Sequence, residues 1–465
     1  MTKFSLKKKL LPSLMAASLA SGVAFSGNAN AIELAENGVG QVLLAPLFLA
    51  NFGYKTKIAI VNTSNDQAVK AKVVLRSAVA SKELLDFLIY LSPSDVWRGE
   101  IRSENGKIVL YSADDSIKND KVPPSGVAVN ADGTTFASIL PLTQEVPTPA
   151  APDTNAMGHI EIIGLYAVND SITVGGKSIK IETGMSKFDL AIIFDSSRSA
   201  LTPVANHSSV DPSWVQLHGN IEMISDNDRM GYRIPALYGT TAPTNPLVIA
   251  NTVFDADVSA VTGIGFGFGT AGTDNILDIE AAIAATMIGG TYEDDGKTKP
   301  NPGINRTNLV VTFPTRYRHF KGNTVAATTT NNPCGVSSVA ISDEYTPPFM
   351  SDGTIEYGLT AYNNFEQRST AVGGIFSGLP TSAITNKLVE VNYFIPAWPA
   401  TSKQSDGVTI TAGTKNFESG WFSMSFITKS GCSYAGAPVL SFSHKYKEKT
   451  PGAFSQSWLV PTKHN

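Results

Sequence analysis

The chain has 465 residues, of which 42% are hydrophobic and 16% charged, and its net charge is −4 at pH 7. This length exceeds that of one ordinary domain, so two domains are the starting expectation. A slightly acidic chain without a basic block is not expected to bind nucleic acid.

Residues 1–31 have the order of a secretory signal peptide. Four lysines precede an apolar stretch of small residues at 10–25, and Ala29-Asn30-Ala31 fits the cleavage site. A buried N-terminal helix is the alternative, but it does not explain this order. No later apolar run reaches the roughly 18 residues that a membrane span needs. We expect an exported mature chain beginning at Ile32, located at the cell surface or outside the cell, with the periplasm as the alternative.

The segment 57–101 predicts consecutive antiparallel strands. Apolar residues at 69, 71, 73 and 75 alternate with Lys70, Lys72, Val74 and Arg76, which is the period of a strand with one face in the core and the other in solvent. A turn-forming cluster at 62–66 precedes this strand. The turn 92–95 separates a strand at 85–91 from another that begins at Val96. This order predicts an antiparallel β-sandwich, for which we expect the immunoglobulin-like type.

Further strands are expected before and after this segment. An opening strand at 40–48 contains Pro46, which suits a sheet edge or a bulge. The proline-rich stretch 114–153 is predicted to be a long surface excursion inserted into the first domain. A short strand is expected before the excursion at 107–111, and later strands at 159–163, 172–174, 179–181, 190–194 and 214–224. Gly175-Gly176 predicts a hairpin, and Gly219 suggests a bulge.

One segment, 274–287, has the pattern of a helix. Ile276, Ile279, Ile283 and Met287 form an apolar stripe at helical spacing, and Gly289-Gly290 is expected to stop the helix. A helix packed on a sheet is the simpler interpretation, and a partner-docking helix is the alternative. Later strands are expected at 309–313, 388–394, 421–428 and 439–442. These elements place an N-terminal sandwich domain at 32–225 and a C-terminal one at 226–465.

The mature N-terminal segment 32–49 is apolar and nearly uncharged after Glu36. Exposed edge strands invite pairing with other chains. The segment therefore has two alternatives: it completes its own sheet, or it extends into a neighbouring molecule by strand addition.

Cys334 and Cys432 are the only cysteines. Export permits a disulfide, and we expect these two residues to be bonded within the C-terminal domain, although two free thiols are the alternative. Closing a loop of about 100 residues is worth up to roughly 4.7 kcal/mol in the chain-entropy model.

A search for catalytic chemistry gives mostly negative results. The sequence has no G-x-S-x-G, H-E-x-x-H, Walker or C-x-x-C motif, and its six histidines are not paired at metal-ligand spacing. No cofactor or metal is therefore expected. Adjacent acids at 114–115, 294–295 and 343–344 are typical of solvated loops. Asp226 and Asp228 resemble part of a calcium loop but lack its remaining ligands, which leaves only loose calcium binding there.

Tryptophans could stack on sugars where they are exposed. Trp97 and Trp421 fall within dense apolar alternation and are interpreted as core residues. Trp398, between Pro396 and Pro399, is the best candidate for an exposed aromatic side chain that stacks on a ligand.

Several blocks, taken together, resemble a family of exported and mostly uncharacterised proteins of Gram-negative bacteria. The blocks are GQVLLAPLF, VNTSN, DFLIYLSPSDVW, GHIEII, ILDIEAAI, LVVTFPT and ESGWFSMSF. DFLIYLSPSDVW and LVVTFPT are the most specific, and the set spans nearly the whole mature chain. The resemblance implies export and a β-rich fold, but it supplies no catalytic residue. The family's cysteine-containing turn has no counterpart in YSADDSIKND at 111–120.

These observations favour a non-enzymatic exported structural or surface-associated protein, a cell-surface or extracellular-matrix component that acts through self-association or attachment to other surface components. An adhesin module that binds a glycan or another surface is the alternative. A secreted hydrolase with an unrecognised site is the third hypothesis, for which two converging carboxylates in a cleft would be the sign.

Overall fold

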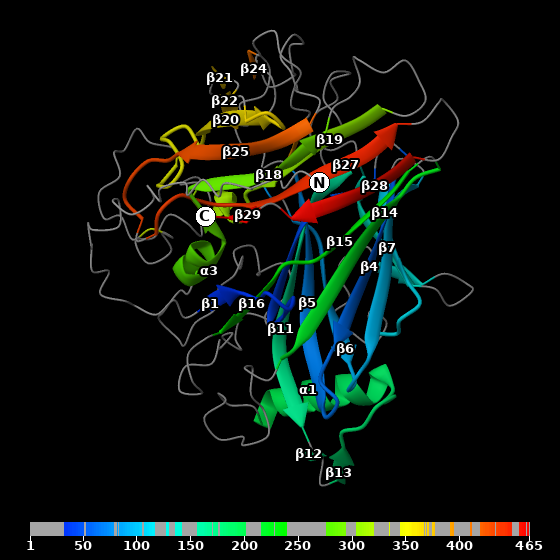
Figure 1. The fold of residues 1–465 in the computed structure, drawn as a ribbon. Coiled ribbons are helices and arrows are strands. Elements are labelled where there is room, and N and C mark those ends of the chain that lie inside the picture. The colour runs from blue at the N-terminus through cyan, green and yellow to red at the C-terminus, as the bar shows by residue number, and fades with distance from the viewer. Residues whose placement is uncertain are drawn as a thin grey trace, which may run out of the picture.

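The computed structural model describes residues 32–50, 53–78, 81, 83–104, 107–116, 127–129, 135–141, 156–169, 171–174, 177–200, 215–226, 228–239, 276–293, 304–319, 334, 345–366, 368, 370–371, 374–376, 391–394, 410–411, 419–432, 434–448, 455–461 and 463–464. Within this part the protein is mainly β with antiparallel sheets, as the sequence predicts (Figure 1). This part contains two α-helices, whereas the sequence predicts one. The predicted signal peptide at 1–31 and Trp398 lie outside the described residues.

A six-stranded sheet is formed mostly by the N-terminal part of the chain. Its strands, in spatial order, are β1 (Ile32–Leu34), β16 (Ala236–Gly239), β3 (Val42–Leu49), β11 (Met157–Asn169), β5 (Gln67–Ser77) and β6 (Glu83–Leu91). The N-terminal segment completes this sheet itself, because β1 pairs with β16 and β3 lies between β16 and β11. The pairing of β3 with β11 shifts register around Pro46, which confirms the predicted bulge.

A twelve-stranded sheet faces the first one. Its order is β23 (Val391–Phe394), β19 (Ile304–Thr312), β27 (Leu440–Glu448), β28 (Ser455–Pro461), β15 (Asp228–Arg233), β14 (Leu217–Ile224), β4 (Lys55–Asn62), β7 (Val96–Glu104), β8 (Lys107–Ser112), β10 (Thr135–Pro141) and β9 (Val127–Val129), with β2 (Val39–Gly40) beside β14. The contact between β15 and β28 is parallel and connects the N-terminal strands with the C-terminal ones. Strands β9 and β10 fall within the proline-rich stretch 114–153, so part of that stretch extends this sheet.

A five-stranded sheet and three small pairs complete the strands of the described structure. The five-stranded sheet has the order β22 (Gly374–Phe376), β20 (Ile355–Asn363), β25 (Ser419–Ile427), β18 (Met287–Glu293) and β29 (Lys463–His464). The pairs are β12 (Ser171–Val174) with β13 (Lys177–Lys180), β17 (Ala284–Ala285) with β26 (Ala437–Pro438), and β21 (Thr370–Ala371) with β24 (Ile410–Thr411). In Figure 1 the five-stranded sheet lies at the top of the view and the helix α1 (Lys187–Ala200) at the bottom.

The helix α1 corrects one sequence prediction. The segment 190–194, expected to be a strand, lies inside this helix. Its start is fixed by Ser186, whose hydroxyl oxygen accepts from the Asp189 amide at 3.1 Å and donates to the Asp189 carboxylate at 2.6 Å. Ser186 is therefore the N-cap of the helix. It favours a helix over a strand because it satisfies an amide that the first helical turn leaves without a partner.

The predicted helix at 274–287 is present but shorter. The helix α3 spans Ile276–Ile283 and is followed directly by β17 and β18. Gly289 and Gly290 therefore lie within a strand and do not end the helix. A 3₁₀-helix, η4 (Arg316–His319), follows β19, and all four of its residues are buried.

Three hydrophobic cores hold these layers together. The first joins the inner faces of the six- and twelve-stranded sheets, with Val73, Phe87 and Trp97 among its members. The second lies on the other face of the six-stranded sheet, which α1 and α3 cover through Ile193, Phe194 and Ile279. The third lies between the five-stranded sheet and β19 with the segment that follows it. Side chains of β19 enter the first core through Val310 and the third through its neighbours Leu309 and Val311.

The second core explains why one expectation about β5 is wrong. The alternation predicts that Lys72 faces solvent, but only 4% of Lys72 is exposed. Its neighbours across the strands are Ile163 on β11 and Leu88 on β6, and both belong to the second core. Lys70 and Arg76 on the same face are buried as well. The face opposite the main core is therefore covered, since helices pack on it.

The predicted bulge at Gly219 is also absent, since β14 pairs with β4 and β15 without a shift of register. A Cβ atom at Gly219 would approach Ile234 to 2.7 Å and Leu43 to 2.9 Å. The glycine is thus explained by close packing of the core on this strand.

Candidate functional site

The middle of the outward side of the five-stranded sheet carries a compact set of uncharged residues, which we call the aromatic face, and Glu293 and Glu356 are the next outward residues beyond it. It consists of three registered rows across β18, β25 and β20, namely Thr291–Trp421–Tyr362, Gly289–Ser423–Thr360 and Met287–Ser425–Gly358. The alternate residues of the same strands, such as Ile288, Phe422 and Leu359, point into the third core. The period of two along each strand therefore separates a buried side from an outward one.

The Trp421 and Tyr362 rings are stacked on this face. Their centroids are 3.9 Å apart and their planes differ by 9°. Trp421 remains 46% exposed, so the expectation that it belongs to the core is wrong. The physical reason lies in its own strand, because Trp421 shares a side with Ser423 and Ser425 while Phe422, Met424 and Phe426 occupy the core. The pair leaves aromatic surface in solvent on the outward side of the sheet.

More apolar surface lies around this sheet. Among the described residues, the exposed large hydrophobic side chains include Phe365, 76% exposed, and Ile427, 55% exposed. Phe365 follows β20 two residues beyond Asn363, near the Trp421 end of the sheet, and Ile427 ends β25. Phe365 and Ile427 thus lie at opposite ends of the sheet, on either side of the rows that contain Ser423 and Ser425.

The other sequence-predicted aromatic residues are distributed differently. Trp97 is fully buried in the first core, as predicted, and lies 5.4 Å from the Phe87 ring between centroids. Trp398, the predicted stacking residue, lies outside the described residues, so its role stays a prediction.

Cys334 and Cys432 form the disulfide that the cysteine count predicts, with a Cα–Cα distance of 4.5 Å. A buried polar cluster lies beside it. His319 Nε2 is 2.9 Å from Glu280 Oε1, and His319 Nδ1 is 3.0 Å from Thr346 Oγ1. Tyr434 donates its hydroxyl to Glu280 Oε2 at 2.5 Å. Burial, followed by the nearby Glu280 carboxylate, raises the pKa of Tyr434 well above its usual range, which keeps this donor protonated.

This buried cluster has the residue types of a hydrolase or a metal site, but its surroundings favour a structural role. Thr346, in the position of a nucleophile, is only 6% exposed, and His319 and Glu280 are completely buried. The ligand atoms of Glu280, His319 and Cys334 lie within 4.8 Å of one another. The Cys334 sulfur is bonded to Cys432, however, and cannot supply the thiolate that a metal site of this composition uses. The cluster connects α3, η4 and the disulfide in the interior.

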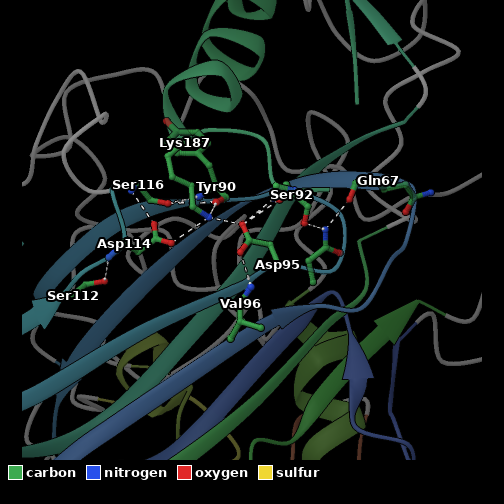
Figure 2. A network of polar contacts seen from close by, with 11 residues as sticks. Gln67, Tyr90, Ser92, Asp95, Val96, Ser112, Asp114, Ser116 and Lys187 are labelled. Carbon is green, nitrogen blue, oxygen red and sulfur yellow. Dashed lines mark hydrogen bonds and ion pairs between the residues drawn. The ribbon is translucent and has the colours of Figure 1, made fainter. Parts of the chain in front are cut away.

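A second polar network forms around the turn 92–95, which lies in the DFLIYLSPSDVW block. Figure 2 shows the Lys187 side chain reaching from α1 to the sheet, where its ammonium group donates to the Tyr90 carbonyl at 2.6 Å and lies 3.1 Å from Asp114 Oδ2. Lys187 also contacts Asp95 Oδ2 at 2.5 Å. Asp95 in turn accepts from the Ser92 amide at 3.1 Å. Lys187 therefore fastens the start of α1 to the end of the sandwich.

The remaining predicted candidates also have structural partners. His159 is buried beside Glu161, which accepts from Arg76 at 2.8 Å. Burial lowers the pKa of His159 below its usual value, and Glu161 opposes that effect. Asp228, a proposed loose calcium ligand, accepts from the Tyr54 hydroxyl at 2.6 Å, whereas Asp226 is exposed. Asp114 belongs to the Lys187 network, and the acids at 294–295 and 343–344 lie outside the described residues.

Neither of the described α-helices has the length and apolar character needed to cross a membrane. No known family model matches this sequence, and no curated protein does so. Among solved structures, the viral chemokine binding protein R17 encoded by rodent gammaherpesvirus Peru aligns with 90% of this chain and 87% of its own, at 9% identity. The TM-score of that alignment is 0.09, so it carries no argument about fold or function.

Proposed function

We propose that this chain is a non-enzymatic, exported, surface-associated protein that attaches to an uncharged glycan through the aromatic face. The observation that carries the proposal is the exposed stack of Trp421 on Tyr362, beside rows rich in serine, threonine and glycine. Charged groups lie at the margin of these rows, where Lys445 donates to Thr291 and Glu356 is the next outward residue of β20. Sugar rings have apolar C–H faces that pack on aromatic rings, and their hydroxyl groups form hydrogen bonds with side chains such as Ser423 and Thr360.

The scaffold fits this role. We infer two sandwich units of the immunoglobulin-like type, one around the first core and one around the third, which share the twelve-stranded sheet. Strand pairing extends the first unit beyond residue 225 to Gly239, since β16 pairs with β3. The signal-like segment 1–31 and the Cys334–Cys432 disulfide support export, because disulfides persist in oxidising compartments.

Co-sedimentation of the mature protein with an insoluble neutral polysaccharide, such as cellulose or chitin, tests the proposal. We expect Trp421→Ala to weaken binding about tenfold, since an aromatic contact is worth roughly 0.5–1.5 kcal/mol beyond the area that it buries. Phe188→Ala is the matched control, because Phe188 is 61% exposed but lies on α1, away from the aromatic face.

Phe188→Ala should retain the melting temperature of the wild type. Trp421→Ala also removes the stack on Tyr362, so we expect a small decrease in its melting temperature, and binding is compared at a temperature where both variants are folded. Equal binding by the two variants would contradict attachment through the aromatic face. Binding assays on isolated cell envelopes extend the test to the polysaccharides that an exported protein would encounter.

Self-association through the same sheet is the second candidate function. It is favoured by the exposure of Phe365 and Ile427 at the ends of the sheet that carries Trp421. Sedimentation velocity at increasing protein concentration tests this candidate. Assembly that Ile427→Asp abolishes would support it, whereas a monomer at every concentration would leave glycan attachment as the function.

A further inference from the structure

A second surface feature lies on a different sheet. A hollow of about 730 Å³ opens on the outward side of the twelve-stranded sheet, across β4, β7, β14 and β15. Its middle is open because Ala59 and Gly231 take outward positions where a long side chain would fill the space. The volume lies within the range of roughly 300–1,000 Å³ that is usual for small-ligand sites. None of its lining residues belongs to the aromatic face.

The acids of this hollow already have cationic partners. Glu100 lies 3.5 Å from the Lys55 ammonium and 3.2 Å from the Arg102 guanidinium. Glu222 is paired with Arg229 on the neighbouring strand. Lys55, Arg102 and Arg229 lie at one end of the hollow. Their positive charges offset those of the Glu100 and Glu222 carboxylates.

The two cations of the lining, unlike its carboxylates, have no ion-pair partner among the described residues. Lys57 and Arg98 are exposed, and within the described part of the chain their side chains form no ion pair or hydrogen bond. The pairing of β4 with β7 sets Lys57 opposite Glu100 and Arg98 opposite Ala59, on the same side of the sheet. Such diagonal neighbours are about 7–8 Å apart. A single anionic group can therefore contact both.

The lining itself is balanced, because Lys57 lies in register between Glu100 on β7 and Glu222 on β14. A positive surplus comes from Lys55, Arg102 and Arg229, which pair with these carboxylates from beyond the lining.

Polar groups surround the two cations. Asn220 lies opposite Ala59 on the β14 side, and Tyr111 lies opposite Glu100 on the β8 side. An arginine presents a planar fork to a carboxylate or sulfate, and a lysine adds a compact charge. The Tyr111 hydroxyl donates to Glu104, and Asn220 Nδ2 lies 3.2 Å from His218 Nε2. The oxygen of the phenol and the oxygen of the amide can still accept from the hydroxyl groups of a sugar ring.

We propose that this hollow binds an acidic saccharide, with its carboxylate or sulfate group held by Arg98 and Lys57 and its hydroxyl groups near Asn220 and Tyr111. The site is separate from the aromatic face, which we assign to an uncharged glycan. One chain would then contact a neutral and an acidic polysaccharide at once, through two sheets.

Calorimetric titration of the full mature chain with a short oligouronate tests the site. We expect Lys57→Gln and Arg98→Gln each to weaken binding at least tenfold, and Ala59→Trp to abolish it by filling the hollow. The affinity should fall with rising salt concentration, because charge contacts near a surface are screened. The matched control is Lys180→Gln, which removes an exposed charge from β13 and should change the affinity less than twofold.

Further measurements distinguish the alternatives. A neutral oligosaccharide of the same length should not bind, and equal binding of it would overturn the role of the charge. A sulfated oligosaccharide that binds with the affinity of the oligouronate would support recognition of an anionic group. If inorganic sulfate binds as tightly as the oligouronate, the site binds a free anion and does not recognise a saccharide. Equal affinity of Lys57→Gln, Arg98→Gln and Lys180→Gln would overturn the site. Trp421→Ala should leave the affinity for the oligouronate unchanged, which separates this proposal from the one about the aromatic face.

Discussion

The Lys187 ammonium lies 2.5 Å from Asp95 Oδ2, although 92 residues separate the two along the chain. The contact joins the first turn of α1 to the turn between β6 and β7. Both side chains are mostly buried, with 13% of Lys187 and 23% of Asp95 exposed. The helix that covers the six-stranded sheet is therefore held in place by an ion pair as well as by apolar packing.

Replacing Lys187 by methionine tests this role. The substitution leaves the Asp95 and Asp114 carboxylates close together without their common cation, and we expect the free energy of unfolding to fall by about 2–4 kcal/mol. Urea denaturation measures the loss. Phe188→Ala changes the next residue of the same helix, which is exposed, and should cost under about 0.5 kcal/mol. Equal effects of the two variants would mean that the ion pair does not position α1.

Strand β5 offers a second test, because charged substitutions on either of its faces should destabilise the fold. Val73→Asp introduces a carboxylate into the first core, and we expect it to prevent folding, since the cost of several kcal/mol approaches a total stability of roughly 5–15 kcal/mol. Lys72→Asp should be nearly as harmful, because Lys72 is buried between Ile163 and Leu88. Ser178→Asp on the exposed side of β13 is the control. Soluble expression and circular dichroism would show the difference, and a well-folded Lys72→Asp protein would contradict the burial.

The stability of the protein should depend on pH through His444. Burial lowers the pKa of His444 to about 4, against about 6.5 in an unfolded chain. Between these values the unfolded state binds a proton that the folded state does not, so the free energy of unfolding should decrease as the pH falls from 6.5 to 4. The loss from this residue reaches about 3 kcal/mol. Chemical denaturation at several pH values in that interval measures how the free energy of unfolding changes with pH. We expect a weaker dependence on pH for His444→Gln than for the wild type. The same dependence in both proteins would assign the effect to other groups.

The disulfide should make a large contribution to stability. Its cysteines are 98 residues apart, and removing a native disulfide typically costs about 2–5 kcal/mol. We expect the double variant Cys334→Ala with Cys432→Ala to melt at a lower temperature than the wild type. Mass spectrometry after alkylation without a reductant provides the direct test, since labelling of both thiols in folded protein would contradict the bond.

Export has its own test. We expect N-terminal sequencing of the protein from its native host to begin at Ile32, in material recovered outside the cytoplasm. Ile32 pairs with Gly239 at the start of β1, so cleavage there would leave the six-stranded sheet intact. A soluble cytoplasmic protein that retains Met1 would contradict the signal peptide.

The sequence by itself determines many of the local elements. The alternation in 69–75 and 85–91, the turn 92–95, and the break at Pro46 correspond to β5, β6, the β6–β7 turn and the bulge in β3, because strand period and turn chemistry depend on neighbouring residues. Two other elements also carry local signals. Ser186 caps the Asp189 amide and marks the start of α1. The serines that alternate with Phe422, Met424 and Phe426 already indicate that Trp421 lies on the outward side of β25.

Tertiary structure alone decides which faces are covered and which distant residues meet. Lys72 sits in a pattern that would leave it in solvent on a two-layer sandwich, and it is buried because α1 and α3 add a layer over that sheet. The stack of Trp421 on Tyr362 and the proximity of Lys57 to Arg98 depend on strand register between β20 and β25 and between β4 and β7. Register and layer order are set by packing of the whole chain, and a local pattern does not contain them.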